Sequence, residues 1–258
     1  RDRSRAYSWT LAPTGAKVQL YVRDRVAGTT VLASSNEAGQ AANGDVDAED
    51  AGNVQFAVSG DGRYAVFASV ATNLSPGDAD AAKDVFRKDL ATGQVTLISV
   101  NSAGEKANAG VGGDPDVSYT GDAVAFTSGA ATNLVPDDAN GNLSDVVVRR
   151  VLAGDTLLAA RTTAGLQANG TTERPAMSAD GRAVAFEAPA GTFNLDPRDA
   201  AGRGNDVFVR SLAADTLAAA SDPSASAGSG FPDVAGDGRF GQNDGANELD
   251  VDKSIMQQ

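Results

Sequence analysis

A repeat of 61 residues constrains this chain more than any other feature of its sequence. The dipeptide Asp-Val recurs at Asp84-Val85, Asp145-Val146 and Asp206-Val207, at two equal spacings of 61. The segment Gln19–Val22 takes the corresponding place earlier in the chain. Self-similarity at a fixed period is typical of folds in which each unit packs against its neighbours, and this chain holds about four such units.

Two further landmarks keep a fixed order within each copy. A Ser-x-x-Gly-like turn precedes an apolar strand in SGDGRYAVFAS (59–69), SYTGDAVAFTS (118–128) and SADGRAVAFEA (178–188), and AGDGRF (235–240) begins another copy. An Ala-Gly…Asn-Gly element follows each Asp-Val position, as AGQAANG (38–44), AGEKANAG (103–110) and AGLQANG (164–170).

The landmarks predict four short antiparallel strands in each copy, separated by Gly, Asp and Asn turns. Such units are the blades of a β-propeller, since each blade buries its faces only against neighbouring blades. A β-helix has a much shorter period, and an immunoglobulin-like array has one nearer ~100 residues. We therefore expect an all-β fold, a β-propeller with about four to five four-stranded blades. A single domain is expected over 1–258, with repeats at approximately 1–52 (partial), 53–112, 113–172, 173–230 and 231–258 (partial).

The segment SADGRAVAF, followed by a loop and by DVFVRSL, resembles the TolB-like or WD-repeat-like propeller repeats of bacteria. The resemblance covers nearly the whole chain. TolB-like propellers generally have six blades, which leaves two alternatives: a part of a six-bladed propeller, or a small propeller closed by pairing its two ends. Repeats of this kind specify a fold and no single activity.

Loop lengths distinguish the two faces of the predicted propeller. The first-to-second connections are tight turns such as Asp61-Gly62, and the third-to-fourth connections are equally short. The second-to-third loops are long, at 71–84, 131–145 and 191–206, and we expect them to lie beside the Ala-Gly…Asn-Gly loops between blades. We call the face formed by these two kinds of loop the long-loop face. Binding residues are found disproportionately on such loops.

Acidic residues gather in the loops of this face, which suits a cation or a basic partner. They are Asp45, Asp47, Glu49, Asp50, Asp78, Asp80, Asp137, Asp138, Asp199 and Asp244.

The strongest candidate for a metal site is the loop from Asp138 to Asp145. Its oxygen-bearing side chains Asp138, Asn140, Asn142 and Asp145 surround Gly141 and resemble, with one residue missing, the calcium loops of integrin-type propellers. Flexible sets of carboxylate and amide oxygens suit calcium. A weaker set is Asp78, Asp80 and Asp84. The alternative is that these residues cap turns and strand starts through backbone N–H groups.

Composition limits the chemistry that is available. The chain has no Cys and no His, so catalysis would rest on carboxylates, Lys, Tyr or Ser. The adjacent pair Asp137 and Asp138 is the carboxylate pair a glycosidase would use, yet neighbours on a polar loop usually point apart. A net charge of −13 argues against nucleic acid and membrane surfaces as partners. Residues 1–10 lack the apolar stretch of a signal peptide.

Three functions remain open on these grounds. The first is an exported bacterial propeller, periplasmic or extracellular, that binds a protein or glycan partner without catalysis and without a required cofactor other than the calcium considered above. The second is the propeller domain of a carbohydrate-active or peptidase-type enzyme. The third is a structural module of a larger surface protein.

Overall fold

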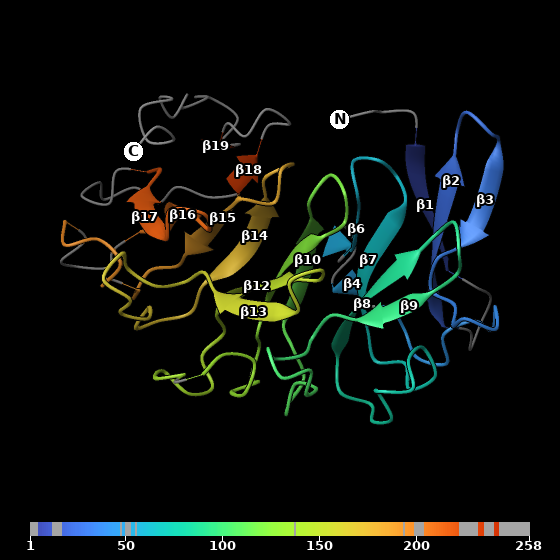
Figure 1. Cartoon of the computed structure of the whole chain (residues 1–258), viewed down its shortest axis with the longest axis horizontal. Coiled ribbons are helices and arrows are strands. Elements are labelled where there is room, and N and C mark those ends of the chain that lie inside the picture. Colours follow the sequence, from blue (N-terminus) through green and yellow to red (C-terminus); the bar gives the residue numbers. More distant parts are fainter. Residues whose placement is uncertain are drawn as a thin grey trace.

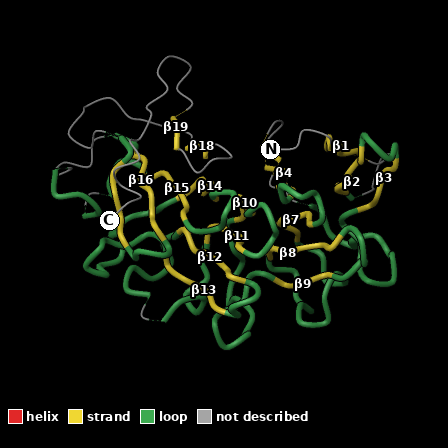
Figure 2. The backbone as a smooth tube through the Cα atoms, turned by 45° about the horizontal axis from the view of Figure 1, so that its top comes forward, coloured by secondary structure: helices red, strands yellow, loops and turns green. Residues whose placement is uncertain are grey.

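The computed structural model describes residues 17–46, 56–136, 138–192, 194–198 and 204–221 with their side chains, and the strand backbones of 5–11, 48–49, 53–54, 232–234 and 240–242. Across these residues every regular element is a β-strand and every pairing is antiparallel, so Figure 2 shows yellow strands and no red helix. The predicted all-β class is confirmed. No helix in this part of the chain is long and apolar enough to cross a membrane.

Three consecutive sheets share one architecture, in which four strands pair in chain order as an antiparallel meander. The first sheet comprises β6 (Phe56–Val58), β7 (Tyr64–Ser69), β8 (Asp84–Asp89) and β9 (Val95–Leu97). The second comprises β10 (Gly113–Val117), β11 (Ala123–Thr127), β12 (Val146–Arg150) and β13 (Asp155–Leu158). The third comprises β14 (Glu173–Met177), β15 (Ala183–Ala188), β16 (Asp206–Ser211) and β17 (Thr216–Ala219). Figure 1 shows the sheets side by side in chain order, which is the arrangement of propeller blades.

Incomplete sheets flank these three blades. The first comprises β1 (Arg5–Leu11), β2 (Val18–Asp24) and β3 (Thr29–Leu32), in which Tyr21 pairs with Leu32 as Phe86 pairs with Leu97 in the next blade. These strands therefore correspond to the second, third and fourth strands of a blade, and among the described strands this sheet lacks the opening one. A two-stranded pair, β4 (Ala48–Glu49) and β5 (Asn53–Val54), precedes β6, and another, β18 (Pro232–Val234) and β19 (Phe240–Gln242), follows β17.

The turns between first and second strands form because a serine and an aspartate satisfy their backbone groups. The Ser59 hydroxyl donates to Asp61 at 2.6 Å and accepts the N–H of Tyr64 at 2.9 Å, while Gly62 takes a positive φ of 69°. The turn at Ser178 repeats this arrangement with Asp180 and Gly181. These segments are the tight turns that the sequence predicted.

The hydrophobic core lies between sheets rather than within one. Phe67, Phe126 and Phe186 occupy corresponding second-strand positions and are fully buried. Phe67 packs with Leu20 and Val22 of the preceding sheet in one continuous cluster. These three rings therefore belong to the core between sheets.

A buried or partly buried basic side chain crosses each junction between described blades. It stands at the same register position on the third strand, as Lys88, Arg149 and Arg210. Lys88 Nζ donates to the carbonyl oxygens of Ser35 at 2.8 Å and Asn36 at 3.1 Å in the turn that leaves the preceding sheet. Arg149 and Arg210 reach the corresponding turns at Asn101 and at Arg161-Thr162. We call these contacts the junction pins.

The first sheet also has a basic residue at this register position, but its side chain is exposed. Arg23 holds the corresponding position on β2, is exposed, and donates to Thr30 at 3.0 Å within its own hairpin. Lys88 and Arg210, in contrast, are only 3% and 1% exposed. Arg23 therefore offers a matched control for the pins.

We predict that Lys88→Met lowers the free energy of unfolding by about 2–4 kcal/mol, because one buried and two partly buried carbonyl oxygens lose the Lys88 donor, the third being Gly93 at 2.7 Å. Arg23→Met should change stability by no more than about 0.5 kcal/mol. Urea denaturation of the two variants tests this. Equal effects of the two substitutions would show that the pins do not stabilise the junctions.

Candidate binding site on the long-loop face

The long loops and the loops between blades lie side by side, as predicted, and the same hydrogen bonds join them at successive junctions. The N–H of Asn43 donates to Asn73 Oδ1 at 2.9 Å, the N–H of Thr72 donates to Asn43 Oδ1 at 2.8 Å, and Asn73 Nδ2 donates to the carbonyl of Ala41 at 2.9 Å. We call this set the asparagine clasp. Figure 1 shows the clasped loops in teal, green and yellow-green below the strands.

The clasp recurs at the next two junctions. Asn108, Thr132 and Asn133 reproduce all three bonds at 2.9 Å. At the third junction the N–H of Asn169 donates to Asn194 Oδ1 at 2.9 Å, and Asn194 Nδ2 donates to the carbonyl of Gln167 at 2.7 Å. The recurring Ala-Asn and Asn-Leu sequences are therefore the two halves of one structural contact.

The first carboxylate cluster of this face brings together the weaker set predicted from sequence. Asp78, Asp80 and Asp84 offer ligand atoms within 4.8 Å of one another. Lys106 Nζ lies among them, at 3.5 Å from Asp78, 3.0 Å from Asp80 and 2.8 Å from Asp84. The ammonium group thus stands where a bound cation would be held, and calcium could bind this cluster only by displacing it.

Burial and the Lys106 charge set the protonation of the cluster. Burial, reinforced by the charge of Asp84, raises the pKa of Asp78 to about 6. Burial also raises the pKa of Asp84, although Lys106 and the Ser99 hydroxyl, which donates to it at 2.6 Å, oppose the shift. The pKa of exposed Asp80 is lowered by the N–H of Ala82 and by Lys106. Burial disfavours the charge of Lys106, but its contacts with Asp84 and Asp80 raise its pKa overall.

The second cluster contains the strongest calcium candidate of the sequence. Gln167 Nε2 donates to Asp138 Oδ1 at 3.0 Å and to Asp145 Oδ2 at 2.8 Å. Asn140 Nδ2 donates to Asp145 Oδ1 at 3.3 Å and to the carbonyl of Ala168 at 3.0 Å. Asn142, the fourth predicted ligand, is exposed. The structure therefore brings three of the four predicted residues together: Gln167 joins Asp138 to Asp145, and Asn140 contacts Asp145 directly.

Asp145 is the most perturbed acid of this cluster. Burial raises its pKa to about 7, and the charge of Asp138 adds to the shift, while the hydrogen bonds from Gln167 and Asn140 oppose it. Two amide donors stabilise a carboxylate less than a full positive charge does. Among the described residues, no cation of the protein compensates the cluster at Asp145.

Register shows that the two clusters are versions of one site. Lys106 forms an isolated β-bridge with Val100, and Gln167 forms the equivalent bridge with Arg161 in the next repeat. Lys106 lies 22 residues after Asp84, and Gln167 lies 22 residues after Asp145. Sequence reasoning missed both residues, although this equal spacing was available as a signal. The serine that donates to Asp84 is replaced by Ala160 beside Asp145, and Asn140 supplies the donor instead.

The other acidic residues of the face do not form one exposed negative surface in the described part of the chain. Asp45 accepts the N–H of Val18 at 2.8 Å and contacts Lys17, and Asp78 is buried. Asp80 remains the exposed acid of the first cluster. The side chains of Asp47, Glu49, Asp50, Asp137, Asp199 and Asp244 lie outside the described residues.

Comparison with known proteins yields matches in structure only. No protein-family model and no curated protein matches this sequence. A prolyl endopeptidase structure is similar with a TM-score of 0.54 at 14% identity, over 95% of this chain and 32% of that chain. KlAtg21, in complex with the coiled coil of AgAtg16, gives a TM-score of 0.50 at 13% identity, over 93% of this chain and 60% of that one.

A putative TolB from Agrobacterium tumefaciens gives a TM-score of 0.49 at 13% identity, over 88% of this chain and 66% of that chain. The chain thus spans between about a third and two thirds of the length of these structures. Together with the sheet topology, the structures with TM-scores of 0.54 and 0.50 confirm the predicted β-propeller fold: the chain folds as the blades of a β-propeller.

We predict that Lys106→Met destabilises the protein by about 3–5 kcal/mol at pH 7, because it leaves buried carboxylates without their counterion. The loss should shrink as the pH falls below about 6, since Asp78, whose pKa is raised to about 6, then becomes neutral. Lys17→Met, which removes an exposed partner of Asp45, is the control and should have little effect. A loss that is independent of pH would contradict this role of Lys106.

A second prediction concerns Asp145, whose folded pKa of about 7 exceeds the ordinary value of 3.8. Between these values the folded protein holds more protons than the unfolded chain, so stability falls as the pH rises. Asp145→Asn should therefore gain stability relative to wild type, by up to a few kcal/mol, between pH 4.5 and 8, about 1.4 kcal/mol per pKa unit. Urea denaturation at several pH values measures this difference.

The control is Asp155→Asn, because Arg150 lowers the pKa of Asp155 and its titration lies below this range. Its stability difference from wild type should stay constant between pH 4.5 and 8. A constant difference for Asp145→Asn as well would contradict the buried, uncompensated state of Asp145. If excess calcium alone abolishes the pH dependence, the predicted calcium site gains direct support.

Proposed function

We propose that this chain is a binding or scaffold module that presents its long-loop face to a partner. The observation that carries the proposal is the asparagine clasp, which joins the loops of successive blades into one continuous surface. A surface fixed before binding loses less conformational entropy when a partner docks. Loops positioned by a rigid scaffold are the usual place for recognition.

The state of the acidic residues supports binding over catalysis. Asp84 and Asp145 are buried at the starts of their third strands, and Asp78 is buried beside Lys106. Their oxygens contact Lys106, Ser99, Gln167 and Asn140, all of which hold loops in place. These carboxylates therefore serve the structure of the face, in a chain that has neither His nor Cys.

The exposed residues of the face favour a protein as the partner. Leu166 is 60% exposed in the loop between blades, and Leu143 is exposed in the adjacent long loop. Leu166 directly precedes Gln167, which contacts Asp138 and Ala139 of the long loop that also carries Leu143. Apolar side chains surrounded by polar groups are typical anchors of protein interfaces. The similar fold of KlAtg21 is recorded in complex with a coiled coil, which agrees with this choice.

The proposal includes export to the periplasm or the extracellular space. It rests on the resemblance of the repeats to bacterial TolB-like propellers. With a net charge of −13, the protein is repelled by nucleic acid and by anionic membranes, so neither is proposed as a partner.

An alternative is that the chain is part of a peptidase-type or carbohydrate-active enzyme, or a structural module of a larger surface protein. The match to 32% of a prolyl endopeptidase chain favours the peptidase version of this alternative. A catalytic domain encoded in the same reading frame would identify it.

A double variant on the long-loop face tests the binding proposal. Leu143→Asp with Leu166→Asp should reduce binding to the natural partner by roughly tenfold or more, because the anchors lose their apolar contact. The control is Leu152→Asp, since Leu152 is 83% exposed in a short turn of the opposite face. Partners are captured from an extract of the source organism with each variant and then measured as purified proteins.

Loss of binding with the Leu143 and Leu166 variant alone supports the proposed face. Equal binding by all three proteins, or loss with Leu152→Asp, would contradict it. Capture of glycans instead of proteins would assign the face to a carbohydrate partner.

A further inference from the structure

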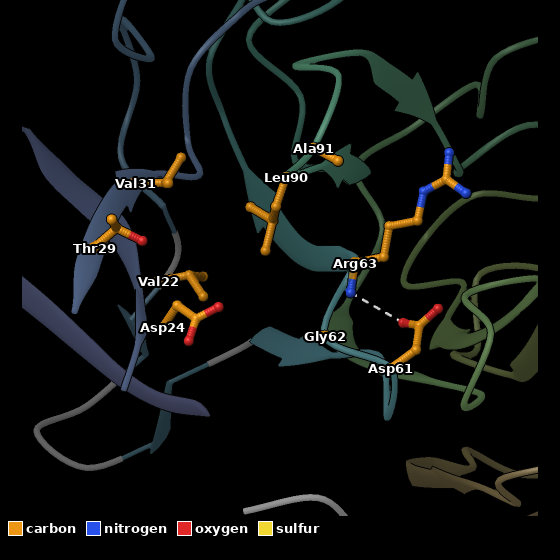
Figure 3. Close-up of a pocket in the computed structure, with 9 residues that line it drawn as sticks. All are labelled: Val22, Asp24, Thr29, Val31, Asp61, Gly62, Arg63, Leu90 and Ala91. Carbon is orange, nitrogen blue, oxygen red and sulfur yellow. Dashed lines mark hydrogen bonds between the residues drawn. The ribbon is translucent and has the colours of Figure 1, made fainter. Parts of the chain in front are cut away.

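A pocket of about 230 Å³ opens between the first sheet and the next blade, on the face opposite the long loops. One wall comes from β2 and β3 with Val22, Asp24, Thr29 and Val31, and the other from short turns with Asp61, Gly62, Arg63, Leu90 and Ala91. Figure 3 shows the two groups facing each other across the opening. The volume lies below the roughly 300–1,000 Å³ of pockets for drug-sized ligands, so it suits a single side chain.

The next junction shows what fills this space elsewhere in the protein. Arg87 in this blade is equivalent to Val22 in the first sheet. Phe86 pairs with Leu97 as Tyr21 pairs with Leu32, and Arg87 and Val22 are the residues that follow Phe86 and Tyr21. The Arg87 guanidinium lies 4.3 Å from the Tyr64 ring centroid and donates to the carbonyl of Gly121 at 2.7 Å. Gly121 corresponds to Gly62 of the pocket, because both close the same turn onto a serine carbonyl. The shorter Val22 therefore leaves unfilled the volume that an arginine side chain takes at the next junction.

The charges around the pocket favour a cation. Asp24 and Asp61 contribute two carboxylates to its lining. Asp24 already accepts the N–H groups of Val26 and Ala27, and Asp61 accepts that of Arg63, so both are held in position. The guanidinium of Arg63 is bound to Asp89 at 2.8 Å, and Figure 3 shows it directed away from Val22 and Asp24. The field inside the opening is therefore negative.

The apolar wall suits the stem of the same side chain. Val22, Val31 and Leu90 line the pocket, and Figure 3 shows the Leu90 side chain reaching toward Val22. Arginine buries its methylene stem against apolar groups and keeps its charged end for polar partners. We propose that this pocket binds the side chain of an arginine presented by a protein partner, with the guanidinium near Asp24, Asp61 and the carbonyl of Gly62.

The probe for the test is the peptide acetyl-Gly-Arg-Gly-amide, titrated into isotope-labelled protein while amide resonances are followed by NMR. Saturable shifts are expected at Gly62, Arg63 and Leu90. The matched citrulline peptide has the same shape without the charge, and its affinity should be lower by roughly tenfold or more. Equal binding of the two peptides, shifts confined to other residues, or no saturable shift would overturn the proposal.

Two variants and one control separate the pocket from the rest of the surface. Val31→Lys places a positive charge at the rim and should weaken binding of the arginine peptide by roughly tenfold. Val26→Lys adds the same charge in the same hairpin outside the pocket, where Val26 is 81% exposed, and should leave binding unchanged. Val22→Arg should abolish binding, because the new side chain would fill the volume that Arg87 fills at the next junction. Unchanged binding in both pocket variants would refute the assignment.

Discussion

The junction between successive sheets is the contact on which the rest of the structure depends. No single sheet can bury its apolar residues alone, so Phe67, Phe126 and Phe186 become core only where two sheets meet. Directional contacts then fix how the sheets meet: a buried cation such as Lys88 holds the exit turn of the preceding sheet, and the asparagine clasp holds the long loops. Packing supplies most of the stabilisation, and these polar contacts set the register of one blade on the next.

The two carboxylate clusters show how one backbone site can be neutralised in different ways. Lys106 gives the aspartates of one blade a full counterion, whereas Gln167 gives the next blade only an amide donor. Burial raises the pKa of the buried aspartates in both clusters, and the pKa of Asp145, beside two amides, reaches about 7. Both solutions serve the same purpose, which is to fasten a long loop to the loop between blades. The loops of the proposed binding face are therefore held together by the same aspartate and asparagine residues that the sequence alone suggested as metal ligands.

The sequence predicted the fold well because its strongest signals are local and repeated. These signals are the Asp-Val spacing, the Ser-x-Asp-Gly turns and the apolar second strands such as Ala183–Ala188. Each of them indicates a strand or a turn at its own position in the sequence. It also placed Asp78, Asp80 and Asp84 together, and Asp138, Asn140 and Asp145 together. It could not identify Lys106 or Gln167 as their partners, because each reaches its aspartate across a loop whose path only the folded structure defines. The pocket at Val22 was missed for a related reason, since it depends on a short side chain where the next repeat has Arg87.

The central claim is that the long-loop face is a fixed surface joined across blades, and hydrogen–deuterium exchange at the clasp tests it most directly. The amides of Asn108, Thr132 and Asn169 each donate across a junction. We predict that they exchange within about tenfold of the slow amides of β11 and β12, because their opening requires the blades to separate. Exchange of these three amides at the rate of an unstructured loop, while the strands stay protected, would contradict the account.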